Sequence, residues 1–101
     1  MTNPKPVRIK NIAIPPGITL ADILVDRGYM AEDSTSCPAF QDYMRFTDQD
    51  YGAFMGGSMP WTEKHCIAVA CFTQISPSFW INLEHNFRRD LANGATHIRD
   101  M

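Results

Sequence analysis

Apolar residues recur along the chain at spacings of three and four positions, and this spacing predicts a series of short helices. In the first helix the apolar positions begin at Leu20, Thr19 serves as the N-terminal cap, and Gly28 ends the helix in a left-handed conformation. The other helices are expected from the Ser36 cap through Met44, from Asp48 to Met55, from Glu63 to Phe72, and from Pro77 up to Asn93-Gly94. The expected caps of the last three are Thr47, Thr62 and Ser76. Short helices with short connections predict an all-α bundle.

The segments on either side of these helices lack that spacing. Residues 1–6 are expected to form a frayed arm, and the alternating residues 7–10 predict a short strand or an extended arm. Ile14-Pro15-Pro16-Gly17 predicts a turn, because proline is excluded from helix interiors. The predicted organisation is therefore an N-terminal arm at 1–13, one domain at 14–93 and a C-terminal tail at 94–101.

Two helices carry clear apolar stripes. For the helix that begins at Glu63, the inner stripe is expected to consist of Cys66, Ile67, Ala70 and Cys71. For the helix that follows Ser76-Pro77, the stripe comprises Phe79, Trp80, Leu83 and Phe87, continued by Leu91. We interpret this second stripe first as core. A homodimer seam through Trp80 and Phe87 is the alternative, since small domains often bury such faces against a second copy.

Composition and charge narrow the possible functions. Hydrophobic residues make up 45% of the chain, which argues against disorder of the whole chain. The formal net charge is −2, so nucleic-acid binding through a bulk positive surplus is not expected. Lys5, Arg8 and Lys10 make residues 1–10 basic, whereas residues 29–63 hold six acidic side chains and a single basic one, Arg45.

The cysteine and histidine pattern points to no metal or catalytic site. Three cysteines without a repeated spacing do not form a disulfide framework, and no Cys/His spacing fits a common zinc motif. No nucleophile and base are placed together by the sequence, so no enzymatic activity and no cofactor are predicted. Without a signal peptide or an apolar run of about 20 residues, we expect a cytoplasmic protein with no membrane association.

The second half of the chain carries a more specific pattern. Pro60-Trp61-Thr62 is followed by an expected helix and then by Ile75-Ser76-Pro77-Ser78-Phe79-Trp80-Ile81-Asn82-Leu83-Glu84. This arrangement resembles the second half of HigA-like antitoxins, which have a proline and threonine after the recognition helix and a later T-S-P-E-F-W-L-N-L-Q segment. The front end is similar too, since Pro16-Gly17 and a helix ending at Gly28 resemble the family's H-P-G-E-x-L opening. The likeness covers residues 14–91.

The resemblance implies a five-helix, lambda-repressor-like helix-turn-helix domain with a short extended N-terminal arm. Two positions of the helix-turn-helix depart from the family, since Gln41 stands where a small Ala is common and Arg45 where the turn usually has Gly. The implied recognition helix reads Thr47-Asp48-Gln49-Asp50-Tyr51-Gly52-Ala53-Phe54-Met55. Ser58 follows it, at a place where the family tends to have Lys or Arg.

The function implied by the resemblance is that of a homodimeric antitoxin and autorepressor, which binds a ribonuclease toxin and represses its own promoter on double-stranded DNA. Thr47 is expected to contact a phosphate and Gln49 an adenine edge in the major groove, with Arg45 on the DNA backbone. The complete expected DNA-contacting set is Arg45, Thr47, Asp48, Gln49 and Ser58.

A hypothesis from a different class starts from the acidic middle of the chain. Carboxylates beside phosphates repel them, so a helix with Asp48 and Asp50 at its start is a poor binder of a polyanion. Under this alternative the helix-turn-helix no longer binds DNA, and the chain is a protein-binding inhibitor. Its contact residues for a basic partner would be Asp42, Asp48 and Asp50.

Overall fold

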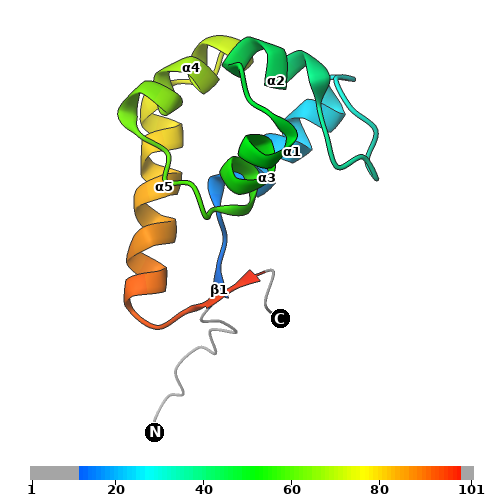
Figure 1. The fold of residues 1–101 in the computed structure, drawn as a ribbon. Coiled ribbons are helices and arrows are strands. Elements are labelled where there is room, and N and C mark those ends of the chain that lie inside the picture. Colours follow the sequence, from blue (N-terminus) through cyan, green and yellow to red (C-terminus); the bar gives the residue numbers. More distant parts are fainter. Residues whose placement is uncertain (1–11, 99–101) are drawn as a thin grey trace, which may run out of the picture.

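The computed structural model describes residues 12–98, which form an all-α domain with one small pair of strands (Figure 1). In chain order the elements are β1 (Ile12–Ala13), α1 (Pro16–Asp26), α2 (Pro38–Met44), α3 (Asp48–Gly56), α4 (Glu63–Thr73), α5 (Pro77–Ala92) and β2 (Thr96–His97). The predicted helices are confirmed, and so are the caps Thr47, Thr62 and Ser76. Residues 1–11, and with them the expected basic arm of Lys5, Arg8 and Lys10, lie outside the described residues.

The start of α1 differs from the prediction. The helix begins at Pro16, with Pro15 as the N-cap residue, rather than at Leu20 with Thr19 as cap. Proline is tolerated at the first helical position because its missing N–H would have no helical partner there. The predicted turn at Ile14–Gly17 is therefore wrong in its second half. A Cβ at Gly17 would collide with the backbone of Met55, so this glycine lets α1 approach α3 closely.

The start of α2 is also shifted. Its N-cap residue is Cys37, not Ser36, and Pro38 occupies the first turn. Cys37 contributes no side-chain cap. Instead, the Gln41 Oε1 atom accepts a hydrogen bond from the Cys37 backbone N–H at 2.9 Å. Ser36 lies one residue before the N-cap, in a local turn in which its backbone N–H donates to the Ser34 hydroxyl oxygen at 3.3 Å.

The buried face of α4 is rotated relative to the predicted stripe. Cys66 and Ala70 are buried as expected, but Ile67 is 47% exposed and Cys71 is exposed. Val69 and Thr73 take the inner positions instead. The spacing alone allowed either face, and packing of α4 against α5 decides between them.

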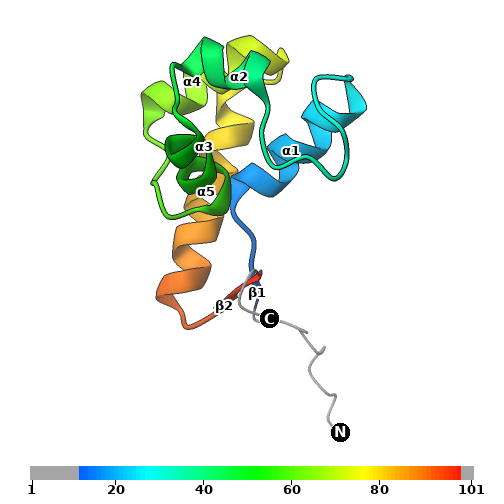
Figure 2. The same cartoon turned by 45° about the vertical axis from the view of Figure 1, so that its right-hand side comes forward.

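Residues 94–98 are part of the packed structure, although the chain from 94 onward was expected to be a tail. After Gly94, which takes a left-handed φ of 90°, β2 pairs in parallel with β1, so that Ile12 is opposite Thr96 and Ala13 opposite His97 (Figures 1 and 2). His97 is buried, its Nε2 atom lies 2.6 Å from the Gly56 carbonyl oxygen, and its ring meets Phe87 edge-on. The packed part of the described chain therefore extends beyond the expected limits of 14–93.

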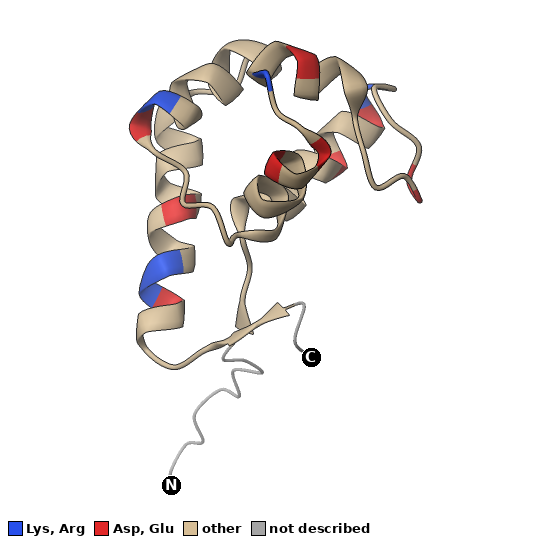
Figure 3. Cartoon of the chain, in the orientation of Figure 1, with Lys and Arg blue, Asp and Glu red and all other residues tan. Residues whose placement is uncertain are grey.

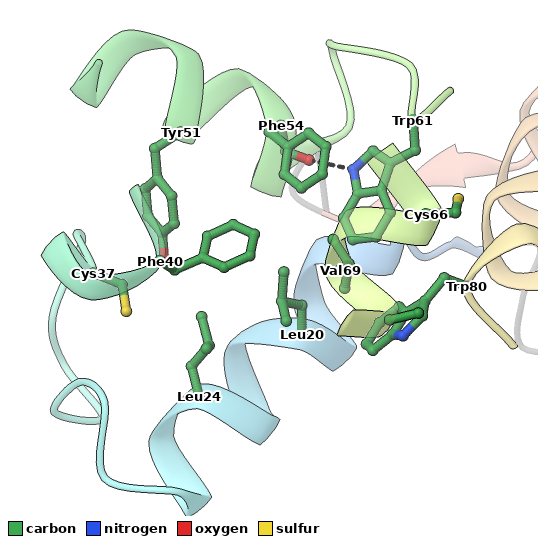
Figure 4. Packing of buried hydrophobic residues seen from close by; sticks show 11 residues of the cluster. Leu20, Leu24, Cys37, Phe40, Tyr51, Phe54, Trp61, Cys66, Val69 and Trp80 are labelled. Atoms are coloured by element: carbon green, nitrogen blue, oxygen red, sulfur yellow. Dashed lines mark hydrogen bonds between the residues drawn. The ribbon is translucent and has the colours of Figure 1, made fainter. Parts of the chain in front are cut away.

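The core lies between the helices and is rich in aromatic rings (Figure 4). Phe54 and Trp61 are stacked with ring centroids 4.2 Å apart, and the Trp61 indole N–H donates to the Phe54 carbonyl oxygen at 2.9 Å. Leu20 and Leu24 of α1 belong to the same buried cluster. Trp80 closes it from α5. The cluster holds α3 in a fixed position against the rest of the domain.

Among residues 12–98, no helix combines the length and apolar character needed to cross a membrane.

Candidate interface on helices α2 and α3

The connection between α2 and α3 is a tight turn of three residues. Arg45 ends α2 in the left-handed conformation, with φ 61° and ψ 43°. The backbone N–H groups that follow fold back onto the helix, as Arg45 N donates to the Asp42 carbonyl at 3.2 Å and Phe46 N to the Gln41 carbonyl at 2.8 Å. Left-handed backbone costs a side-chain-bearing residue about 1 kcal/mol. The turn therefore keeps a strained conformation at a position that glycine would occupy freely.

The first turn of α3 is closed by a reciprocal cap. The Thr47 hydroxyl oxygen accepts from the Asp50 backbone N–H at 3.0 Å, and the Asp50 carboxylate accepts from the Thr47 backbone N–H at 3.2 Å. Such a box satisfies two N–H groups that the helix cannot satisfy by itself. The negative charges of Asp48 and Asp50 also lie at the positive end of the helix dipole, which stabilises the helix. Local helix stability thus accounts for both acidic residues.

Gln41 links the two helices. Its side chain is only 7% exposed, its Oε1 atom accepts from Cys37 N, and its Nε2 atom donates to the Asp48 Oδ1 atom at 2.8 Å. A polar bridge of this kind replaces the close apolar contact that a small residue would give. Sequence reasoning noticed Gln41 only as a departure, and the bridge depends on distances that the sequence does not contain.

Four of the five expected DNA-contacting residues lie together at the start of α3. Arg45, Thr47, Asp48 and Gln49 are all exposed there. Ser58 is exposed as well, but it follows the opposite end of α3, and its hydroxyl donates to the Ala53 carbonyl at 3.5 Å. The structure therefore brings together the N-terminal four and separates Ser58 from them.

The same surface is strongly acidic. In Figure 3, the ribbon is red at positions along α1, the connector after it, α2 and the start of α3. Between residues 28 and 62, Arg45 is the single basic residue. Over residues 12–98 the chain has five Lys and Arg against ten Asp and Glu. Of the alternative partner-contacting set, Asp42 lies exposed on α2, while Asp48 and Asp50 carry the hydrogen bonds described above.

Aromatic packing beneath this surface makes it rigid. Phe40 of α2 is fully buried and meets the rings of Tyr51 and Phe54 from α3. The Tyr51 hydroxyl lies 3.6 Å from the Met30 sulfur, and burial, with a smaller effect of the Cys37 charge, raises the pKa of Tyr51 to about 12. The Tyr43 hydroxyl donates to the Ala68 carbonyl at 2.7 Å, which ties α2 to α4. The two helices are thus held as one unit.

Trp80 and Phe87 are core residues, as the first interpretation of this stripe had it. The alternative, a homodimer seam formed by these two side chains, is wrong. Trp80 is 0% and Phe87 1% exposed, because both point into the chain's own core. Of the predicted stripe only Phe79, at 40%, is exposed. Within the described part of the chain no group of three or more His, Cys, Asp or Glu side chains is arranged to hold a metal ion.

No family model, no curated protein and no solved structure matches this chain.

Proposed function

We propose that this chain is a helix-turn-helix regulator of the HigA antitoxin type, in which α3 reads operator DNA. The observation that carries the proposal is the left-handed Arg45 in the three-residue turn between α2 and α3. A helix-turn-helix needs a sharp reversal over three or four residues, which is why the turn often contains glycine. Arg45 occupies the position where the family has that glycine, and the capped helix that follows is the one expected to enter the major groove.

The chemistry of the exposed residues supports this role. The Thr47 hydroxyl is an acceptor in the cap, so its proton is available to a phosphate oxygen. Gln49 is exposed in the first turn and has the amide needed to pair with an adenine edge. The Arg45 guanidinium is suited to a backbone phosphate. In a homodimer, two α3 helices would enter successive major grooves about 34–36 Å apart. A ribonuclease toxin is the protein partner that the resemblance implies.

A second candidate function is favoured by the charge of the same surface. Between residues 28 and 62 the chain has five acidic residues and one basic residue, Arg45, which is a poor basis for holding a polyanion, because phosphate contacts supply much of the affinity of DNA-binding proteins. A basic protein would meet this surface with attraction instead. Under this reading the chain is a protein-binding inhibitor that uses Asp42, Asp48 and Asp50, and DNA is not its ligand.

DNA binding by the purified protein separates the two candidates. The duplexes are the region upstream of its own gene and a scrambled control, titrated from about 50 to 200 mM salt, where phosphate contacts weaken measurably. A working repressor binds the upstream duplex in preference to the scrambled one, with a steep salt dependence. Absence of binding at the lowest salt refutes the DNA function and directs attention to a basic protein.

Matched variants locate the contact. Gln49→Ala should weaken specific binding by roughly 1–3 kcal/mol if the amide reads a base. Asp48→Asn and Asp50→Asn keep the acceptor oxygens used within the domain but remove charge, so they should strengthen binding to any DNA and weaken binding to a basic partner. Glu32→Gln, an exposed acid on the connector after α1, is the control for a general change of charge. If Glu32→Gln changes binding as much as Asp48→Asn and Asp50→Asn do, α3 is not the contact surface.

A further inference from the structure

A pocket of about 300 Å³ lies between the start of α4 and the middle of α5, away from the turn between α2 and α3. The six residues that line it are Trp61, Glu63, Cys66, Ile81, Glu84 and His85. Two carboxylates, one indole ring and one aliphatic side chain thus border a single pocket. Neither of the functions proposed above uses it.

Glu84 is the unusual member of the pocket wall, since its side chain is charged and yet the residue is only 6% exposed. Its Oε2 atom accepts from the Trp61 backbone N–H at 3.1 Å and from Arg88 Nε at 2.8 Å. Its Oε1 atom is buried and accepts no hydrogen bond from any described residue. A buried acceptor without a donor is costly, so the Glu84 carboxylate keeps unmet hydrogen-bonding capacity at the pocket wall.

Arg88 offsets only part of the negative charge of Glu63 and Glu84 at the pocket. Its Nη2 atom donates to the Gly57 carbonyl oxygen at 2.7 Å, which holds the guanidinium towards the loop after α3. Glu63 is exposed at the pocket, and the ion pairs found among residues 12–98 do not include it. One carboxylate therefore remains uncompensated beside the pair of Glu84 and Arg88.

One wall of the pocket is fixed in place, and both carboxylates act on the thiol beside it. The Trp61 ring is fixed by its stacking on Phe54 and by its indole hydrogen bond. Burial, and then the charges of Glu84 and Glu63, raise the pKa of the Cys66 thiol to about 11, so the thiol is neutral at neutral pH. Both carboxylates thus act on the same buried position at the side of the pocket.

We propose that this pocket binds the cationic end of an arginine or lysine side chain presented by a basic protein partner. A guanidinium or ammonium group brings N–H donors and positive charge to the carboxylates, and its alkyl stem suits Ile81 and the indole of Trp61. The inference does not depend on whether α3 binds DNA. It assigns contact with a basic protein to α4 and α5.

The probe is acetyl-arginine-amide, with acetyl-lysine-amide as a second cation and acetyl-citrulline-amide as the neutral match in shape. Binding to the full chain is followed by ¹H–¹⁵N NMR, in which the backbone amide of Trp61 reports on its bond to Glu84. The two cationic ligands should shift the signals of the pocket residues with an affinity on the order of millimolar, as expected for a fragment of this size. Citrulline should shift them far less.

Glu63→Gln should weaken arginine binding by about two- to fivefold, the range expected for an exposed ion pair. Glu63 is exposed, so this variant should fold normally, and Glu32→Gln is its control with the same change of charge. The proposal is overturned if the citrulline probe binds as tightly as the arginine probe. It is also overturned if Glu63→Gln and Glu32→Gln weaken arginine binding to the same extent. Propylguanidinium has the same single positive charge and no peptide groups, and tighter binding of this ion than of the capped amino acid would overturn the assignment to a protein.

Discussion

The bridge made by Gln41 gives a prediction whose size can be worked out from the structure. Gln41→Ala replaces the bridging side chain with a small apolar one. If the bridge stabilises the domain, this change should destabilise it. The alternative is that alanine lets α2 and α3 pack more closely and restores what the hydrogen bonds supplied.

The two ends of the bridge contribute unequally. Loss of Gln41 Oε1 leaves the N–H of the buried Cys37 without its side-chain acceptor, and such an orphaned group costs about 1–3 kcal/mol. Loss of Nε2 affects Asp48, which is exposed and can be hydrated, so this end should cost about 0.5–1 kcal/mol. Alanine regains a few tenths of a kcal/mol, roughly, through its higher helix propensity. The net expected loss is about 2–3 kcal/mol.

The assay is urea unfolding, followed by far-UV circular dichroism and by tryptophan fluorescence, with the slope m compared between variants. Asp48→Ala leaves the Cys37 N–H bonded but removes the acceptor of the Gln41 Nε2 donor, so it should cost less than Gln41→Ala, which removes both hydrogen bonds. The double variant should show a coupling energy of about 0.5–1 kcal/mol. The reasoning would be refuted if Gln41→Ala were as stable as the unmodified chain. It would also be refuted if the two single variants lost the same free energy of unfolding.

Three further predictions follow from local geometry. Gly17→Ala should destabilise the domain by about 1–3 kcal/mol or more, because the added Cβ meets the α3 backbone. Gly52→Ala has open space around its Cβ and should stabilise the domain by about 0.5–1 kcal/mol. Thermal unfolding of both variants tests this, and a change of stability in the same direction for the two would contradict it. Arg45→Gly should relieve the left-handed turn and stabilise the domain by about 1 kcal/mol in urea unfolding while weakening any DNA binding, and a loss of stability would argue against strain at this turn. The raised pKa values of Cys66, about 11, and Tyr51, about 12, keep both groups protonated in the folded state after the unfolded chain has lost these protons, so the free energy of unfolding should fall between about pH 9 and 12. In Tyr51→Phe the free energy of unfolding should fall less steeply above about pH 10. The same pH profile as in the unmodified chain would count against a raised pKa of Tyr51.

For the candidate interface, the sequence predicted which residues gather at the start of α3, because a cap and a helix place neighbours along the chain in neighbouring positions in space. It therefore located Arg45, Thr47, Asp48 and Gln49 correctly as exposed neighbours. The sequence did not reveal that Asp48 is bound to Gln41 and that Asp50 closes the cap, since both roles depend on side-chain distances. It also gave Glu84 no role beyond a place in the matching segment, although the spacing from Trp80 to Glu84 and Phe87 marks one helix face.

The elements of this fold were determined by local chemistry. Apolar spacing, capping hydroxyls and glycine at helix ends act over one or two turns, so the sequence alone was sufficient for all the helices and for three of their caps. What the tertiary structure decided is the direction each helix faces. Packing of α4 against α5 exposed Ile67 and buried Val69, and packing into the core withdrew Trp80 from any partner. The pairing of β1 with β2 joins residues more than eighty positions apart, and no local pattern in the chain encodes such a contact.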